Sequence, residues 1–156
     1  MIVKLIDAAA MVADLKAVTK PGVLEELLEH AGKAGAFAAK AGKALAKRLA
    51  EREAIGSTGL GNTVAVPHVK GAEVERATLV LGRCRKGLDW QAIDGRPVHV
   101  VFLLVSPADA PEGHLQCLRW IAGLARSADF RRFLLDAKDG PGMRDLLREM
   151  SGKVEP

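Results

Sequence analysis

Apolar residues recur every three or four positions in several stretches of the chain, which is the spacing of amphipathic helices. The first predicted helix begins at Pro21 and ends near Gly32. An alanine-rich segment, 32–52, predicts a second helix to about Arg52, because its apolar residues fall on one stripe and its lysines lie roughly opposite. A third helix begins at His114, after a loop over 107–113. Two shorter helices follow, at about 130–137 and 143–150.

Short runs rich in β-forming residues lie between these helices. They predict strands at 64–66 and 77–84, and a further pair, 88–93 and 98–106, joined by a tight Asp94-Gly95 turn. The run VHVVFLLV (98–105) has no clean polar alternation, so we expect a central strand covered on both faces. The order of helices, strands and helices predicts an α/β fold, a single-domain sandwich in which helices flank a mixed β-sheet.

The length of 156 residues is that of one domain. An apolar fraction of 49% and a charged fraction of 27% are typical of folded soluble proteins. No linker, repeat or low-complexity segment divides the chain. We therefore expect one domain over residues 1–150 and a flexible C-terminal tail over 151–156.

Membrane and secreted proteins are disfavoured by three observations. Asp7 and Asp14 interrupt the apolar N-terminal stretch, which argues against a signal peptide. The longest strongly apolar run, 98–105, is far shorter than the ~20 residues that cross a bilayer. Cys84 and Cys117 fit no metal spacing and are too few for a disulfide framework. The sequence therefore predicts a cytoplasmic protein without membrane insertion.

The net charge of +4 raises the question of nucleic-acid binding. The basic residues cluster in 32–52, where Lys40, Lys43 and Lys47 lie opposite the apolar stripe, as on any amphipathic surface helix. The chain contains no Tyr and no recognition motif of the usual nucleic-acid modules. We expect no nucleic-acid partner.

The four histidines differ in their surroundings. His30 lies near the end of a charged helix, and His99 alternates with valines on the predicted central strand, so both favour structural roles. His68 follows Pro67 at the end of a short strand that comes after a glycine-rich loop, and His114 opens a helix after the longest strand. Strand ends and helix starts of an open α/β sheet are where sites are usually built, so His68 and His114 could meet there.

The segment EREAIGSTGLGNTVAVPHVK (51–70) resembles the signature of the enzyme IIA domain of the fructose, mannitol and nitrogen-regulatory type. This family belongs to the bacterial phosphoenolpyruvate-dependent phosphotransferase system (PTS). The segment 88–125 is similar to the family's second half, with its Asp-Gly-x-Pro turn, its apolar strand into proline and its His-Leu pair. The resemblance covers nearly the whole chain and implies the type-2 IIA fold.

The resemblance implies a role for each matching residue. His68 would accept a phosphoryl group from the histidine of an HPr-like donor protein, and would pass it to a cysteine or histidine of a IIB-type partner or hold it as a signal. His114 would lie beside His68 and fix its ring or the phosphate. Arg52 would be a charge partner for the phosphoryl group.

The residue chemistry is compatible with these roles. An imidazole is partly neutral near pH 7, so one nitrogen can attack while the other is held by a hydrogen bond. Phosphoryl transfer needs donors aimed at the phosphoryl oxygens, and the backbone N–H groups of the loop at Ser57, Thr58 and Gly59 are suitable. The hydroxyls of Ser57 and Thr58 either donate as well or only satisfy the loop backbone. No metal and no cofactor is expected.

One position departs from the family pattern. The residue after the active histidine is usually glycine, but here it is Val69. A β-branched residue permits neither a positive φ nor a close approach as easily as glycine does. We therefore expect the surface offered to the donor or acceptor to change.

Three functions fit the sequence. The first is a phosphocarrier in PTS sugar uptake, and the second is a nitrogen-regulatory-type IIA protein whose phosphorylation state controls its binding to other proteins. The third is a binding domain that has lost phosphorylation, and the joint presence of His68, His114 and Arg52 counts against it.

Overall fold

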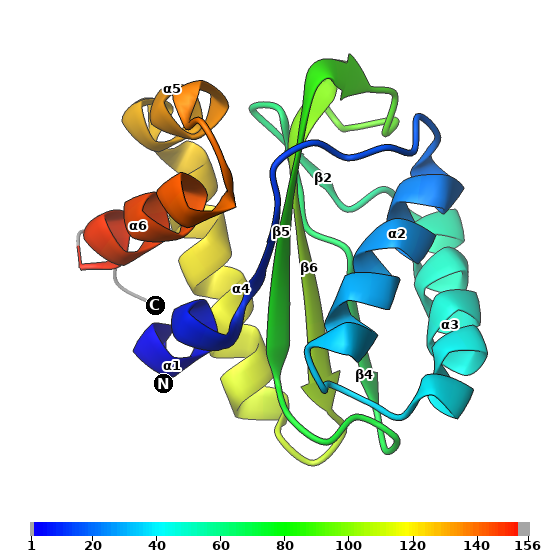
Figure 1. Ribbon diagram of the computed structural model, residues 1–156. Helices are drawn as coiled ribbons and strands as arrows, with labels where there is room; N and C mark the ends of the chain where they lie inside the picture. Colours follow the sequence, from blue (N-terminus) through cyan, green and yellow to red (C-terminus); the bar gives the residue numbers. More distant parts are fainter. Residues whose placement is uncertain (1, 153–156) are drawn as a thin grey trace.

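A six-stranded mixed sheet lies between two layers of helices (Figure 1) in the computed structural model, which describes residues 2–152. The strand order is β1-β5-β6-β3-β2, and β4 also pairs with β6. Helices α2 and α3 cover one face, and α1, α4, α5 and α6 lie on the other (Figure 1). The predicted single α/β sandwich with a mixed sheet is confirmed.

The helices are α1 (Ile2–Ala8), α2 (Lys20–Lys33), the short 3₁₀ helix η1 (Ala39–Ala41), α3 (Gly42–Ile55), α4 (Pro111–Arg126), α5 (Ala128–Asp136) and α6 (Gly140–Ser151). The strands are β1 (Ala10–Val12), β2 (Gly59–Gly61), β3 (Val64–Ala65), β4 (His68–Gly71), β5 (Thr78–Leu88) and β6 (Val98–Pro107). None of these helices is long and apolar enough to cross a membrane.

Strand β6 is the centre of the sheet and carries both hydrophobic cores. Val101, Leu103 and Val105 pack into the core beneath α2 and α3, whereas Phe102 and Leu104 pack into the core beneath α4. All five side chains are fully buried. The prediction of a central strand covered on both faces is confirmed, because the run is apolar toward two cores at once.

The edge of β6 that faces away from β5 is shared by two short parallel strands. Val64 and Ala65 of β3 pair beside Val100 and Val101, and β4 then pairs from His68 beside Leu104 onward. Pro67 lies between them and has no N–H to donate, so the pairing is interrupted there. His68 was expected to end a strand, but it is the first residue of β4.

The predicted second helix, 32–52, begins too early. Helix α2 continues to Lys33, and Gly35 then adopts a φ of +89°, which an L-residue rarely adopts. Phe37 forms an isolated bridge with Val74, so this stretch runs against the β4–β5 connection before η1 begins. The third helix also begins earlier than expected, because Pro111 is favoured in the first turn and places His114 inside α4.

The predicted strand 88–93 does not exist. Strand β5 ends at Leu88, Gln91 has a φ of +56°, and the buried Trp90 anchors an irregular loop before β6. Strand β2 lies inside the glycine-rich loop that was expected before the strand at 64–66, and α1 and β1 precede the first predicted element. Of the predicted tail, Ser151 ends α6, and 153–156 lie outside the described residues.

Candidate functional site

His68 and His114 lie side by side although 46 positions separate them in the chain. Their ring centroids are 5.5 Å apart and the ring planes are inclined by 54°. His68 comes from the start of β4, and His114 comes from the first turns of α4. The two meet because β4 pairs with the end of β6, from which a short loop leads directly into α4.

The ring of His68 is oriented by the backbone two residues before it. Its Nδ1 lies 2.8 Å from the carbonyl oxygen of Val66. A carbonyl only accepts hydrogen bonds, so Nδ1 carries the proton and the neutral ring keeps its lone pair on Nε2. Among the described residues, Nε2 has no hydrogen-bond partner. His68 is half-buried.

His114 is a buried and neutral neighbour. Its side chain is 7% exposed, and its Nδ1 lies 2.7 Å from the hydroxyl oxygen of Ser106. Burial, followed by the charges of His68 and Lys70, lowers the pKa of His114 from 6.5 to about 4. The ring is therefore uncharged at pH 7 and can offer a single N–H to a ligand.

Lys70 is a part of the site to which the sequence assigned no role. In β4 it pairs beside Ser106, two residues beyond the pair of His68 and Leu104. Alternate residues of a strand share a face, so Lys70 and His68 both lie on the α4 side of the sheet. Its positive charge is the third cause, after burial and the charge of His68, that lowers the pKa of His114. The two-residue period of strands was the signal that could have identified Lys70.

The residues predicted to form a phosphate loop make contacts within the fold. Ser57 donates its hydroxyl to the carbonyl of Trp90 and accepts from the N–H of Gly59. The backbone N–H and hydroxyl of Thr58 both bond to the carboxylate of Glu53. A Cβ on Gly59 would lie 2.7 Å from that of Ala92. These contacts favour the alternative in which the hydroxyls satisfy the loop, and phosphate binding here stays a prediction.

A buried ion pair between α2 and α3 contacts this loop. Lys20 of α2 lies 2.5 Å from Glu53 of α3, and both side chains are largely buried. Lys20 also donates to the carbonyl of Trp90, whose indole N–H donates to Thr58. The carbonyl of Thr58 accepts from the N–H of Val66, the residue that orients His68. Sequence reasoning missed this network because its members are up to 70 positions apart.

Arg52 lies in the last turn of α3, close in sequence to the loop. Its guanidinium donates to the carbonyl of Gly56 at 2.7 Å, which satisfies an open carbonyl at the end of the helix. None of the contacts described for Arg52 reaches His68. Its predicted role as a charge partner of the phosphoryl group stays a prediction.

The side chain of Val69 points into the fold. Its side chain is 7% exposed and packs in the core beneath α2 and α3, because it pairs beside Val105 and points away from His68. The side chain of Val69 is therefore not part of the surface offered to a partner, and any effect through the backbone stays a prediction. The valine fills space in the core.

The site therefore contains two adjacent imidazoles, His68 of β4 and His114 of α4. Residues 4–150 match the family described as "Phosphoenolpyruvate-dependent sugar phosphotransferase system, EIIA 2". The chain belongs to this EIIA family. The resemblance stated for 51–70 and 88–125 is thereby confirmed.

Relatives of this EIIA-family chain include regulatory and sugar-specific proteins. A nitrogen regulatory protein of Bradyrhizobium diazoefficiens is 33% identical over 94% of both chains. A PTS system fructose-specific EIIA component of Haloferax volcanii is 33% identical over 85% of this chain and 84% of its own. A fructose-specific EIIABC component of Bacillus subtilis is 29% identical over 87% of this chain, which spans 21% of its length.

The EIIA fold is also found in a solved structure. The nitrogen regulatory protein IIA-Ntr from Neisseria meningitidis superposes with a TM-score of 0.83 and 28% identity, over 92% of this chain and 99% of its own. In the present chain, the segment 51–70 that resembles the EIIA signature begins in the last turn of α3, continues through β2 and β3, and includes His68.

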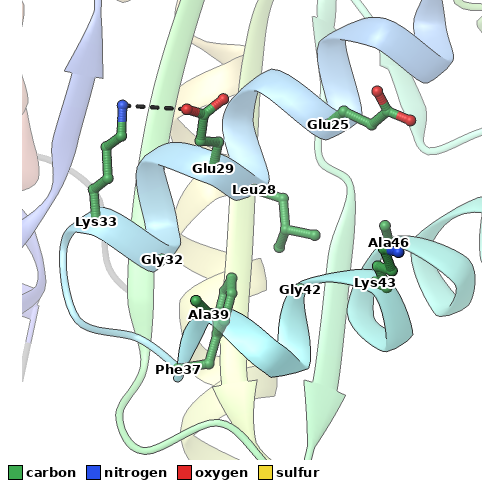
Figure 2. Close-up of a pocket in the computed structure, with 10 residues that line it drawn as sticks. All are labelled: Glu25, Leu28, Glu29, Gly32, Lys33, Phe37, Ala39, Gly42, Lys43 and Ala46. Atoms are coloured by element: carbon green, nitrogen blue, oxygen red, sulfur yellow. Dashed lines mark ion pairs between the residues drawn. The ribbon is translucent and has the colours of Figure 1, made fainter.

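Hollows of the EIIA surface lie on both sides of the sheet. A groove of about 530 Å³ separates α2 from α3, and Figure 2 shows Glu25 and Glu29 on its α2 side and Lys43 on its α3 side. Neither His68 nor His114 lines this groove, which lies on the other side of the sheet. A cleft of about 360 Å³, mostly apolar, borders His114 and Ser106. Within residues 2–152, no group of His, Cys, Asp and Glu side chains is arranged to hold a metal.

Proposed function

We propose that this EIIA-family chain is a phosphotransferase component that accepts a phosphoryl group on Nε2 of His68 from an HPr-like phosphodonor. It passes the group to a IIB-type partner in PTS sugar uptake. The observation that carries the proposal is the hydrogen bond from Nδ1 of His68 to the carbonyl of Val66, which leaves the nucleophilic lone pair on Nε2.

Each transfer exchanges one bond to phosphorus for another. The lone pair of Nε2 attacks the phosphorus, and the P–N bond of the donor's phosphohistidine breaks as the new Nε2–P bond forms. The carbonyl of Val66 stabilises the positive charge that the His68 ring acquires. In the forward step the Nε2–P bond breaks as the phosphoryl group moves to a cysteine or histidine of the partner.

Charge on the phosphoryl oxygens needs nearby donors. His114 supplies one N–H from a ring that burial keeps neutral, and Lys70 supplies a positive charge from the same face of β4. Arg52 is a further candidate from the adjoining end of α3. Ser57, Thr58 and Gly59 serve mainly by holding the loop that orients Val66.

Phosphorylation in a reconstituted PTS chain tests the acceptor. Incubation with phosphoenolpyruvate, enzyme I and an HPr-like donor should add one acid-labile, base-stable phosphate. His68→Ala should abolish the labelling, and His30→Ala, on α2 at the other face of the sheet, is the matched control. Labelling that survives in His68→Ala would place the acceptor elsewhere and overturn the proposal.

A regulatory function is the second candidate. Two observations favour it: the whole-length match to the Bradyrhizobium nitrogen regulatory protein, and the superposition on the Neisseria IIA-Ntr structure. In this case the phosphorylation state of His68 controls binding to another protein. Transfer from the phosphorylated chain to an isolated IIB-type domain supports sugar uptake. A phosphate that stays on His68 while the affinity for a target protein changes supports regulation.

A further inference from the structure

Ser106 is a polar residue near the end of the apolar strand β6, and it contacts His114. Its side chain is 1% exposed, and its hydroxyl oxygen lies 2.7 Å from Nδ1 of His114. This is the one hydrogen bond of the Ser106 side chain within the described residues. A buried serine in a run of valines and leucines costs free energy unless its hydroxyl is bonded, so the contact with His114 accounts for its presence.

The direction of this hydrogen bond follows from counting donors. If the neutral His114 ring carried its proton on Nδ1, that N–H would donate to Ser106, and the serine hydroxyl proton would be buried without an acceptor. If Ser106 donates to Nδ1 instead, its own proton is bonded and the ring proton is placed on Nε2. A buried donor without a partner is rarer than an under-used acceptor, so the second arrangement is the stable one.

We propose that Ser106 is a positioning residue that holds His114 in its Nε2–H tautomer, so that this ring donates to the phosphoryl group carried by His68. The inference rests on the function proposed for His68. The two neighbouring rings then have opposite tautomers, each fixed through Nδ1. The Val66 carbonyl leaves a lone pair on Nε2 of His68, whereas the Ser106 hydroxyl leaves a proton on Nε2 of His114. One ring can form the bond to phosphorus while the other donates.

Ser106 also fixes where the His114 ring lies. It pairs beside Lys70 in the sheet, so one strand position anchors the imidazole next to the lysine. Losing an anchor of this kind leaves the ring able to turn and to change its tautomer. We therefore expect a smaller loss of transfer rate than removal of the ring itself causes.

The tautomer of His114 can be read directly by long-range ¹H–¹⁵N NMR of the unphosphorylated chain at pH 7. The wild type should show a proton on Nε2 of His114. Ser106→Ala should show an increased population of the Nδ1–H form, and its phosphorylation by an HPr-like donor should be slower by about tenfold, the effect of one lost hydrogen bond. Ser106→Thr keeps the hydroxyl and should restore both the tautomer and most of the rate.

Thr78→Val is the matched control, because it removes another buried strand hydroxyl, one that bonds to the carbonyl of Arg76 instead. It should leave the His114 tautomer unchanged. A wild-type His114 protonated on Nδ1, or a Ser106→Ala variant with unchanged tautomer and rate, would overturn the inference. The NMR measurement needs no phosphate, so it is independent of the phosphorylation assay. If wild-type His68 accepts no phosphate, the proposed function fails whatever the tautomer.

Discussion

Lys20, at the start of α2, forms a largely buried ion pair with Glu53, near the end of α3, at 2.5 Å. The same carboxylate accepts from the backbone N–H and the hydroxyl of Thr58. The pair therefore joins both helices on this face of the sheet to the loop that leads to His68. Its position makes it a support of the loop without any contact to the His68 ring.

Replacing Glu53 should weaken both the fold and the site. Glu53→Ala leaves the ammonium of Lys20 buried without its partner, which should lower the free energy of unfolding by about 3 kcal/mol in urea denaturation. Glu29→Ala, which removes an exposed i,i+4 pair with Lys33, should cost less than about 0.5 kcal/mol. Equal losses in the two variants would show that the buried pair does not stabilise the loop.

Replacing His114 should slow transfer to His68 without removing the acceptor. His114→Ala deletes a positioned donor, which commonly costs a factor of about 100 to 1,000 in rate. His114 does not cap its helix, because Ala110 is the N-cap of α4 and no side chain caps it. His114→Gln retains an N–H and should transfer faster than His114→Ala. His99→Ala, on β6 and bonded to the carbonyl of Cys84, is the control with normal labelling.

The stability of the protein should fall as the pH drops below about 6.5. His114 has a pKa of about 4 in the folded chain and an ordinary value of 6.5, so between these values the unfolded chain binds the extra proton. The contribution is complete above pH 6.5 and is lost as the pH falls to about 4. A shift of this size amounts to at most about 3 kcal/mol. Urea denaturation between pH 4.5 and 6.5 should show a steeper pH dependence for wild type than for His114→Gln, and equal slopes would contradict the assignment.

Removing the charge of Lys70 should change the pKa of His114 and the rate at which His68 is phosphorylated. Lys70→Gln should raise the pKa of His114, since the lysine is one of the charges that lower it, and NMR titration of the ring measures this. Loss of the exposed cation should slow phosphorylation of His68 by up to about fivefold, the range of a surface charge contact. Lys43→Gln, beside the α2–α3 groove, should change neither quantity. An unchanged His114 pKa in Lys70→Gln would separate Lys70 from the site.

Restoring the family's glycine at position 69 should destabilise the fold and spare the chemistry. Val69→Gly removes a buried side chain from the core and frees the backbone, which together should cost about 2 to 3 kcal/mol of unfolding free energy. Val18→Gly, at a residue that is 80% exposed, should cost less than about 1 kcal/mol. Phosphate should still be accepted on His68. Unchanged stability together with altered donor affinity would instead place the Val69 side chain at the partner surface.

Much of the fold could be predicted from local patterns. The apolar run 98–105 identified the central strand, since only a strand covered on both faces needs so little polarity. The predictions failed where non-local contacts overrode local preference. The alanine-rich segment contains many good helix formers, yet no helix forms where Gly35 adopts a positive φ and Phe37 bridges to Val74. The strand expected at 88–93 failed because the buried Trp90 holds an irregular loop there.

The sequence by itself determined the family, the central strand and the identity of the candidate acceptor, His68, because these depend on residue order and periodicity alone. It also indicated His114 as a neighbour, from its place after the longest strand. Only the tertiary structure decided how the two rings are held. The Val66 carbonyl, the Ser106 hydroxyl and the charge of Lys70 act over a few ångströms, and strand pairing brings them together from separate parts of the chain. Tautomer and pKa depend on such contacts and on burial, which no local pattern encodes.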